Sequence, residues 1–313
     1  MIPDISVIIM VYNRKAFLKR AIESVVNQTL AKDKYEILVI LNFEDHDLDH
    51  FSQRVSFYHF SQMSVGEVIQ FGIKKSNGKI ICFLDDDDIF KPNKLEKVWE
   101  IFIKHTDLVY YHNNHLIFHS SFDFGRGTLF TNAMSFLPKS KQTLRSVRKA
   151  LNQGGDFNMS CITIRKEAYP YNIELKFNYL QDSILFMLLL GKGDFLIDDE
   201  ILTLYHLHDS SSSNQNIEII VNSSILALHE VDMHVQSPFN RLLRSDLATN
   251  YLLSDILNVT SSRSIKKLIN DTFVLLRDLT VLNFGKLFLI LCLAMVSLFF
   301  PRLAKNILNS IKY

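Results

Sequence analysis

Four consecutive aspartates, Asp85, Asp86, Asp87 and Asp88, are the residues of this sequence whose types and spacing most clearly indicate chemistry. A free Asp has a pKa of about 3.9, so near pH 7 the four would carry closely spaced negative charges. Bulk water, the N-terminus of a following helix or a bound cation must offset their repulsion. The pattern therefore predicts either a cation site or a solvated acidic cap of a helix.

The elements that must position these aspartates are predicted to alternate between strand and helix. Apolar runs rich in β-branched residues predict strands at residues 5–12, 36–41, 54–60 and 79–84. Helical spacing of apolar residues predicts helices at residues 17–26, at residues 65–75 and from Pro92 onward. Such alternation is typical of an open, mostly parallel α/β sheet, in which ligands bind beyond the carboxyl ends of the strands. The polar clusters at residues 13–14, 42–45 and 85–88 are expected to meet at that edge.

The second half of the chain is predicted to be mixed. Strands are expected at residues 107–118, 157–164 and 195–208. A basic helix is expected at residues 139–152 and a largely buried helix at residues 178–190, with further helices from about Asn216 onward. Three histidines, His112, His115 and His119, lack the spacing of metal ligands on a strand and are interpreted as surface or acceptor-side residues.

The composition narrows the class of protein. A net charge of +1, from 34 basic and 33 acidic residues, argues against nucleic acid as a partner. Three cysteines that lie far apart fit neither a disulfide framework nor a zinc site, which favours a reducing compartment. The first residues lack the features of a signal peptide. These observations predict an intracellular protein with one large or two medium domains.

Residues 287–300 form an apolar stretch without any charged residue. As a helix this stretch would be roughly 21 Å long, shorter than the roughly 30 Å of a bilayer core. Basic residues flank it, and an extension back to residue 281 reaches bilayer length. We expect membrane contact through residues 281–313, at the cytoplasmic face of the cell membrane. The alternative is a buried helix of a soluble cytoplasmic protein.

The motifs SVIIMVYNR, LKRAIESVVNQTL, YEILVI, GKIICFLDDDDIF, LQD and YHLHDSSS occur in this order along the chain. Together they resemble glycosyltransferase family 2, over roughly residues 4–213. The resemblance implies a GT-A domain at residues 1–213, with a mostly parallel mixed sheet flanked by helices, and a C-terminal helical region at residues 214–313. It also implies inverting transfer from a nucleotide-diphosphate sugar to a hydroxyl of a glycan or of a polyprenyl- or other lipid-linked acceptor.

The resemblance assigns the aspartates to a metal-binding DxD motif. It implies that Asp85 lies near the ribose and the metal shell, that Asp87 binds the ion directly and that Asp86 occupies the variable position. His208 is expected to close over the ion or the diphosphate. The ion is expected to be Mg²⁺ or Mn²⁺, which prefer carboxylate oxygens and offset the charge that develops on a leaving diphosphate.

The remaining donor-binding residues are also assigned by resemblance. They are the turn Val11, Tyr12, Asn13 and Arg14, then Asn42, the helix start with Gly66 and Gln70, the acids Asp85 and Asp86, and Asp156 as a sugar contact. Two departures from the family are visible, because the family commonly has Pro where Val11 stands and an acidic pair where Leu41 and Asn42 stand. The second departure leaves uracil and guanine equally open as the base.

Asp182 is assigned as the general base, because an inverting transfer needs a carboxylate to accept the proton of the acceptor hydroxyl. It follows Gln181 and precedes an apolar run, a setting that can raise the pKa of a carboxylate. The alternative is an acid placed at a helix start for the helix dipole.

Two other functions remain open at this point. A sugar nucleotidyltransferase needs a similar sheet and metal site, but usually also a glycine-rich basic loop after the first strand, and this chain has no glycine there. A non-catalytic nucleotide-sugar-binding membrane protein is the other alternative.

Overall fold

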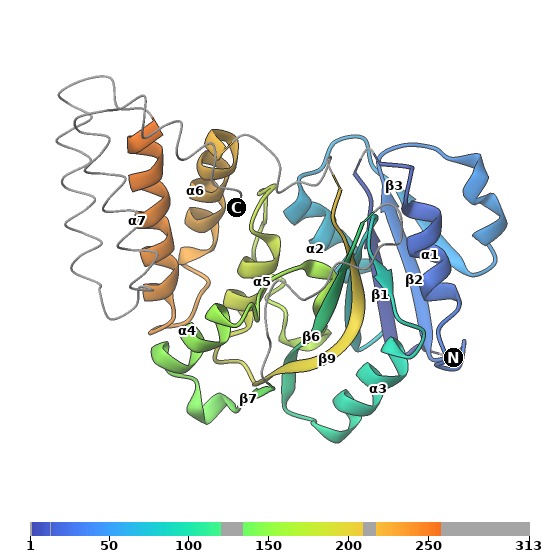
Figure 1. Cartoon of the computed structure of the whole chain (residues 1–313), viewed down its shortest axis with the longest axis horizontal. Helices are drawn as coiled ribbons and strands as arrows, with labels where there is room; N and C mark the ends of the chain where they lie inside the picture. Colours follow the sequence, from blue (N-terminus) through green and yellow to red (C-terminus); the bar gives the residue numbers. More distant parts are fainter. Residues whose placement is uncertain (1, 13, 120–133, 209–216, 258–313) are drawn as a thin grey trace.

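The computed structural model describes residues 2–12, 14–119, 134–208 and 217–257 of the chain. Across these residues one nine-stranded sheet runs in the order β3-β2-β1-β4-β8-β6-β9-β5, with β7 paired to β9 (Figure 1). The strands are β1 (Ile5–Met10), β2 (Tyr35–Leu41), β3 (Val55–His59), β4 (Ile80–Asp85), β5 (Ile89–Phe90), β6 (Leu108–Phe118), β7 (Ser135–Leu137), β8 (Ile162–Arg165) and β9 (Asp194–His206).

The four strands β3, β2, β1 and β4 are parallel to one another, as the alternating sequence pattern predicted. In the register of this half, Met10 lies opposite both Ile40 and Asp85, so the carboxyl ends of β1, β2 and β4 lie at one level. Antiparallel pairing of β8 with β4 and with β6 then makes the sheet mixed. The register therefore brings the residues after β1, β2 and β4 to one edge.

Helices cover both faces of the sheet and build two hydrophobic cores (Figure 1). The helices are α1 (Leu18–Val26), α2 (Val65–Lys75), α3 (Lys94–Lys104), α4 (Leu144–Asn152), α5 (Gln181–Leu189), α6 (Ile217–Asp232) and α7 (Asn240–Leu257). Residues of α1 and α3 contribute to one core, and residues of α2, α4, α5, α6 and α7 contribute to the other. Alternate side chains of β1 enter opposite cores, which explains its continuous apolar sequence.

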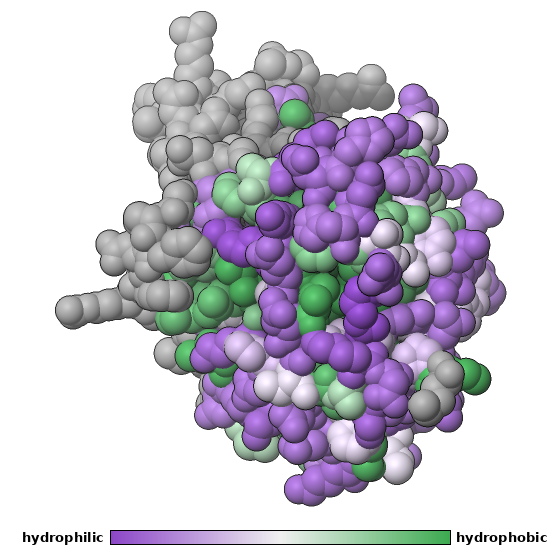
Figure 2. All heavy atoms as spheres, turned by 90° about the vertical axis from the view of Figure 1, so that its right-hand side faces the viewer, coloured by the Kyte–Doolittle hydropathy of each residue, from purple (hydrophilic) through white to green (hydrophobic). Residues whose placement is uncertain are grey.

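The sheet ends at β3, whose side chains are partly exposed. Figure 2 shows this end of the molecule, where hydrophilic side chains cover most of the surface. An edge strand with a solvated face explains why the sequence signal for β3 is weaker than that for β1 and β2.

Three sequence predictions need correction in the second half. The predicted strand at 157–164 is shorter, because Met159–Cys161 forms a 3-10 turn and β8 begins only at Ile162. The predicted helix at 139–152 begins at Leu144, where the side chain of Thr143 accepts a hydrogen bond from the Ser146 N–H and caps the helix. His112 and His115 are buried in β6, so interpreting them as surface residues was wrong.

The C-terminal prediction cannot be followed through the structure, because residues 258–313, with the apolar stretch 287–300, lie outside the described residues. The described part of the predicted C-terminal region is the pair α6 and α7, which pack together. Among the helices that are described, none has both the length and the apolar character needed to cross a bilayer.

Candidate active site

The four aspartates lie where β4 ends, and three of them are nearly fully buried. Asp86, Asp87 and Asp88 are 1%, 8% and 1% exposed, which is incompatible with a solvated acidic cap. Burial, followed by the charges of the three neighbouring aspartates, raises the pKa of Asp85 well above its usual value. Burial also raises the pKa of Asp86 to about 7, although Arg14 opposes that shift. Within the part of the chain that the structure describes, positive charge therefore offsets the charge of the cluster only in part.

Arg14 supplies part of the missing charge. It follows β1, and its guanidinium contacts an Asp86 carboxylate oxygen at 2.5 Å and an Asp87 oxygen at 2.6 Å. Backbone Tyr12 N–H also donates to Asp86, at 3.4 Å. The loop after β1 is thus tied to the turn after β4 by one ion-paired network, as the shared register of the two strands requires.

Two histidines from the end of β9 close the other side of the cluster. His208 Nε2 lies 2.9 Å from an Asp87 oxygen. His206 donates its backbone N–H to Asp88 at 2.9 Å, and its ring lies 4.8 Å from that of His208. Burial lowers the pKa of His206 to about 4, so its ring is neutral at pH 7. Arg20 lies 3.3 Å from His206 Nδ1, and because a guanidinium only donates, that nitrogen accepts and Nε2 carries the proton.

Asn158 connects the aspartate cluster to the predicted base. Its side chain donates to Asp88 at 3.1 Å, and its backbone N–H donates to Asp182 at 3.1 Å. Its side-chain oxygen accepts from the Ser160 N–H at 2.7 Å, and the Ser160 hydroxyl accepts from the Asp85 N–H at 3.0 Å. Asp182 and Asp88 are therefore linked through a single residue, Asn158, although they are distant in sequence.

Backbone strain marks the same place. Among the described residues, Asn158 (φ +69°) and Leu180 (φ +63°) are the non-glycine residues with positive φ. Each such residue costs about 1–3 kcal/mol and persists where the surroundings determine its conformation. Asn158 donates to Asp182, and Leu180 stands directly before the helix that carries Asp182. The strain lies on both sides of this carboxylate.

The Asp182 carboxylate is held at the first turn of α5. One oxygen accepts from the Ser183 N–H at 2.9 Å and the other from the Asn158 N–H at 3.1 Å. Burial raises the pKa of Asp182, and these two hydrogen bonds oppose the shift. Asp156 lies close by, where its carboxylate accepts from the Ser183 hydroxyl at 2.5 Å. Burial, followed by the charge of Asp182, raises the pKa of Asp156 to about 7.

The structure distributes the predicted nucleotide-binding residues unevenly. Tyr12 is 46% exposed and its hydroxyl donates to the Met63 carbonyl at 3.3 Å, so its ring lies at the surface beside the cluster. Val11 is 1% exposed and packs in the core, so its predicted contact with the nucleotide, which stays a prediction, would involve its backbone. Asn42 directly follows β2 at the same edge. Asn13 lies outside the described residues.

Gly66 and Gln70 lie on α2 and hold the segment before α5. The Gly66 N–H donates to the Phe177 carbonyl at 2.9 Å, and a Cβ at position 66 would lie 2.8 Å from Leu175. Gln70 is buried, accepts from the Leu175 N–H at 3.1 Å and donates to the Ile173 carbonyl. Their observed contacts are with this segment, and contact with a nucleotide stays a prediction.

The donor set fits a hard divalent cation. Asp87 and His208 already lie within 2.9 Å of each other, and Asp85 is a half-buried carboxylate whose pKa is raised by burial and by the charges of the neighbouring aspartates. No group of three His, Cys, Asp or Glu side chains in the described ranges is arranged around one ion position. Mg²⁺ usually takes only one or two carboxylates, with substrate phosphates and waters completing its shell, so two protein ligands suffice.

Three residues of this network were not singled out from the sequence. Asn158 and Ser160 stand in a stretch that reads as a strand, and Lys94 reads as a surface residue at the start of α3. Lys94 is fully buried, and its ammonium group donates to the Ser160 carbonyl at 2.5 Å and to the Thr203 hydroxyl at 3.0 Å. Polar residues inside the apolar strand β6, Asn113 among them, were the available signal of a buried polar layer.

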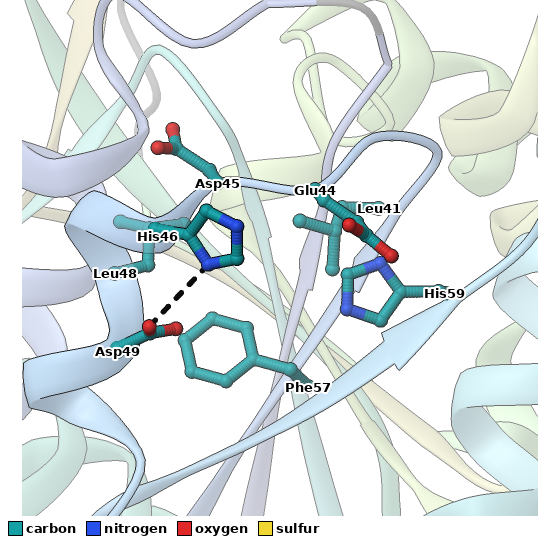
Figure 3. Close-up of a pocket in the computed structure, with 8 residues that line it drawn as sticks. All are labelled: Leu41, Glu44, Asp45, His46, Leu48, Asp49, Phe57 and His59. Atoms are coloured by element: carbon teal, nitrogen blue, oxygen red, sulfur yellow. Dashed lines mark ion pairs between the residues drawn. The ribbon is translucent and has the colours of Figure 1, made fainter.

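A separate pocket of about 230 Å³ lies against the end of β2 and the edge strand β3 (Figure 3). Phe57 and Leu41 line it, and both belong to the core on the α1 side of the sheet. His46 and Asp49, one turn apart on the same 3-10 helix, lie 3.5 Å from each other on one side of it (Figure 3). Glu44 and Asp45 of the predicted polar cluster 42–45 line the pocket, whereas none of the four consecutive aspartates does.

Comparison with known sequences identifies the family. The sequence model of glycosyl transferase family 2 matches residues 6–169, just over half of the 313 residues. The chain belongs to glycosyl transferase family 2. The family predicted from the motifs is thereby confirmed.

Curated relatives agree with this family. An uncharacterized glycosyltransferase from Rickettsia bellii is 35% identical over 117 residues, which cover 36% of this chain and 16% of the relative. Another from Rickettsia typhi is 25% identical over 223 residues, which cover 68% of this chain and 66% of the relative. The minor teichoic acid biosynthesis protein GgaB of Bacillus subtilis is 28% identical over 113 residues, which cover 33% of this chain and 12% of that protein.

Solved structures agree with the predicted fold. Staphylococcus aureus TarS 1–349 in complex with UDP-GlcNAc superposes with a TM-score of 0.62, over 98% of this chain and 89% of that chain. Its complex with UDP gives the same TM-score over 97% of this chain and 90% of that chain. Sequence identity is 13% and 12%, respectively, so the likeness concerns the fold alone. The chain has the GT-A fold.

Proposed function

We propose that this glycosyltransferase is an inverting enzyme. It would move the sugar of a UDP- or GDP-sugar donor to a hydroxyl of a glycan or lipid-linked acceptor. The observation that carries the proposal is the hydrogen-bonded connection Asp88–Asn158–Asp182. Through this connection a half-buried carboxylate, that of Asp182, lies beside the aspartate cluster at which a nucleotide diphosphate would bind. An inverting transfer needs this pair of features, because the base and the leaving group act on opposite sides of one carbon.

On the donor side, Tyr12 offers an exposed ring to the base, and Arg14 offers a fixed positive charge near the diphosphate. Two of the three side chains Asp85, Asp87 and His208 would hold Mg²⁺ or Mn²⁺, which would neutralise charge on the departing diphosphate. Burial and, after it, repulsion by the neighbouring aspartates raise the pKa of Asp85, and binding of a divalent cation would offset the repulsion.

On the acceptor side, Asp182 would accept the proton of the attacking hydroxyl. The acceptor oxygen forms a bond to C1 of the sugar while the bond from C1 to the diphosphate oxygen breaks. Burial raises the pKa of Asp182, and a carboxylate with a raised pKa is a stronger base. The Ser183 and Asn158 N–H groups fix the direction of the carboxylate.

The experiment compares nucleotide release and sugar transfer for UDP- and GDP-sugars with Mn²⁺, for the wild type, Asp182→Asn and Asp87→Asn. Loss of a positioned base lowers turnover by about 10²–10⁴-fold, so we expect Asp182→Asn to keep donor binding and lose turnover. Asp87→Asn is expected to weaken the cation dependence instead. Asp33→Asn, an exposed acid in the loop before β2, serves as the matched control.

The opposite result would favour the non-catalytic alternative. It would be a wild type that binds a nucleotide sugar but neither releases the nucleotide nor transfers the sugar to any acceptor. Formation of a nucleotide sugar from a sugar phosphate and a nucleoside triphosphate would instead favour the nucleotidyltransferase. Membrane contact through residues 281–313, at the cytoplasmic face of the cell membrane, stays a prediction that a flotation assay with vesicles can test.

A further inference from the structure

A second cavity lies directly behind the proposed base. It has a volume of about 300 Å³ and is enclosed by α4, α5, α6 and α7 together with the loop that carries Asp156. On α5 the residues Ser183, Ile184 and Met187 face this cavity, at the spacing of one helix face. Asp182, next to Ser183, instead turns toward Asn158 and the aspartate cluster. Adjacent residues in the first turn of α5 thus face different sites: Asp182 faces the aspartate cluster, and Ser183 lines the cavity.

The cavity wall combines hydrogen-bonding groups with apolar side chains. Its polar groups are of the kinds that bind sugar hydroxyls, namely carboxylate, amide and hydroxyl: Asp156, Asp246, Asn152, Asn250, Ser183 and Ser224. Apolar residues such as Val221 and Leu228 form the rest of the wall, and both are nearly fully buried. A sugar ring presents hydroxyls at its rim and C–H groups on its faces, which matches such a lining.

The size and the charge of the cavity limit what it can hold. Small-molecule sites span about 300–1,000 Å³, so this cavity suits one or two sugar rings. Two carboxylates, Asp156 and Asp246, and one guanidinium, that of Arg148, line it. Whether Asp156 is protonated or ionised, these three side chains carry no net positive charge, so they offer a phosphate group no excess of positive charge.

We propose that this cavity binds the acceptor, and that the acceptor's terminal unit is an uncharged sugar residue rather than a phosphate-bearing polyol. The inference rests on the proposed function, because it needs Asp182 as the base. A sugar seated against Asp156 and Ser183 can direct a hydroxyl past the first turn of α5 to Asp182. The raised pKa of Asp156 fits this role, because a carboxyl group that shares a proton at neutral pH can both donate to and accept from hydroxyls.

Saturation-transfer NMR with UDP and Mg²⁺ present tests the proposal. The probes are methyl glycosides of glucose, galactose, mannose and N-acetylglucosamine, together with sn-glycerol 3-phosphate. We expect at least one glycoside to bind saturably and sn-glycerol 3-phosphate not to bind. Ser224 is 2% exposed on α6, so Ser224→Trp fills the cavity and should weaken glycoside binding by about tenfold or more.

Leu226→Trp is the matched control, because Leu226 lies on the same helix and is 67% exposed. It should leave glycoside binding unchanged. Asn250→Ala, which removes one amide from the wall with little change in volume, provides a second variant if Ser224→Trp does not fold. Both cavity variants are checked for folding by circular dichroism.

Three results would overturn the proposal. They are binding of sn-glycerol 3-phosphate alone, binding of no probe, and glycoside binding that both cavity variants leave intact. Failure of the proposed function would be seen separately, as a wild type that does not release nucleotide from any donor. An enzyme that hydrolyses donors but ignores every glycoside would therefore keep its proposed function and lose this acceptor.

Discussion

The aspartates of this site form two sets whose carboxylates are stabilised in different ways. At the end of β4, Asp86 and Asp87 are buried against the Arg14 guanidinium, and Asp87 also contacts His208. At the start of α5, Asp156 and Asp182 are held by backbone N–H groups and the Ser183 hydroxyl. The first set depends on opposite charge, whereas the second depends on hydrogen bonds from neutral donors.

This difference matches the chemistry proposed for each side. A cluster that binds a cation and an anion must exchange ion partners during turnover, and charged side chains on loops can do so. A general base must hold one direction and keep a raised pKa, and neutral donors fix direction without stabilising the charge as strongly as a cation would. Asn158 connects the two sets of carboxylates, so its replacement tests whether the two sets depend on each other.

Among the changes that keep all the aspartates of the two sets, replacement of Asn158 should have the largest effect on kcat. Asn158→Gly tolerates the positive φ and keeps the N–H that Asp182 accepts, but removes the donor to Asp88. A misplacement of about 1 Å costs about 10²-fold in rate, so we expect kcat to fall by that order while KM for the donor changes little. Steady-state kinetics across pH should also show a shifted acid limb, since the surroundings of Asp182 change.

Asn158→Asp sharpens the same test. It keeps the acceptor for the Ser160 N–H but replaces the donor to Asp88 with a second carboxylate. We expect a larger loss than for Asn158→Gly, because like charges then face each other in a buried place. Equal kinetics for wild type and Asn158→Gly would contradict the role of this connection.

Replacement of Arg14 should have the next largest effect, on stability and on cation dependence. Arg14→Gln removes the partner of two buried carboxylates, and removing one partner of a buried pair is destabilising by a few kcal/mol. Because Arg14 is 29% exposed, we expect on the order of 2 kcal/mol, measured by urea unfolding. Mg²⁺ should restore more stability to this variant than to the wild type. Lys15→Gln is the control, because the Lys15 side chain contacts the exposed Glu44 carbonyl and the Phe43 ring instead.

The sequence predicted the aspartates that have charged partners better than those held by neutral donors. The parallel strands β1, β2 and β4 are continuous apolar runs, so their ends, and with them Arg14 and the four aspartates, could be located from the pattern. The helix α2 was predicted with the bounds that it has, since its capping box and its terminal Ser-Asn are local signals.

The aspartates held by neutral donors depend on tertiary contacts that leave little local signal. Asn158 adopts positive φ inside a stretch whose composition favours a strand, and its turn is fixed by partners that are distant in sequence, Asp88 and Asp182. Lys94 is buried only because the Ser160 carbonyl and Thr203 lie above it. Asp182 was assigned through resemblance, whereas the cavity behind it needed α6 and α7 to be placed.

The smallest effect is expected for Asp156→Asn, and it concerns stability rather than rate. The folded-state pKa of Asp156 is about 7, and that of an unfolded Asp is about 3.9. Between these values the folded protein keeps a proton that the unfolded chain has lost, so the contribution of Asp156 to stability falls as pH rises from about 4 to about 7. The Asn side chain does not titrate and still accepts from the Ser183 hydroxyl. The Asp156→Asn variant should therefore lack this fall in the free energy of unfolding.

Urea unfolding of wild type and Asp156→Asn at pH 4, 6 and 8 measures the difference. We expect little difference at pH 4 and a more stable variant at pH 8, by on the order of 1 kcal/mol. Titration of Asp86 and Asp88 occurs in both proteins and cancels in the comparison. A variant that is less stable than wild type at pH 8 would mean that the ionised carboxylate has a stabilising partner. Both sets of aspartates would then be stabilised by opposite charge, and the distinction between a set held by charged partners and a set held by neutral donors would fail.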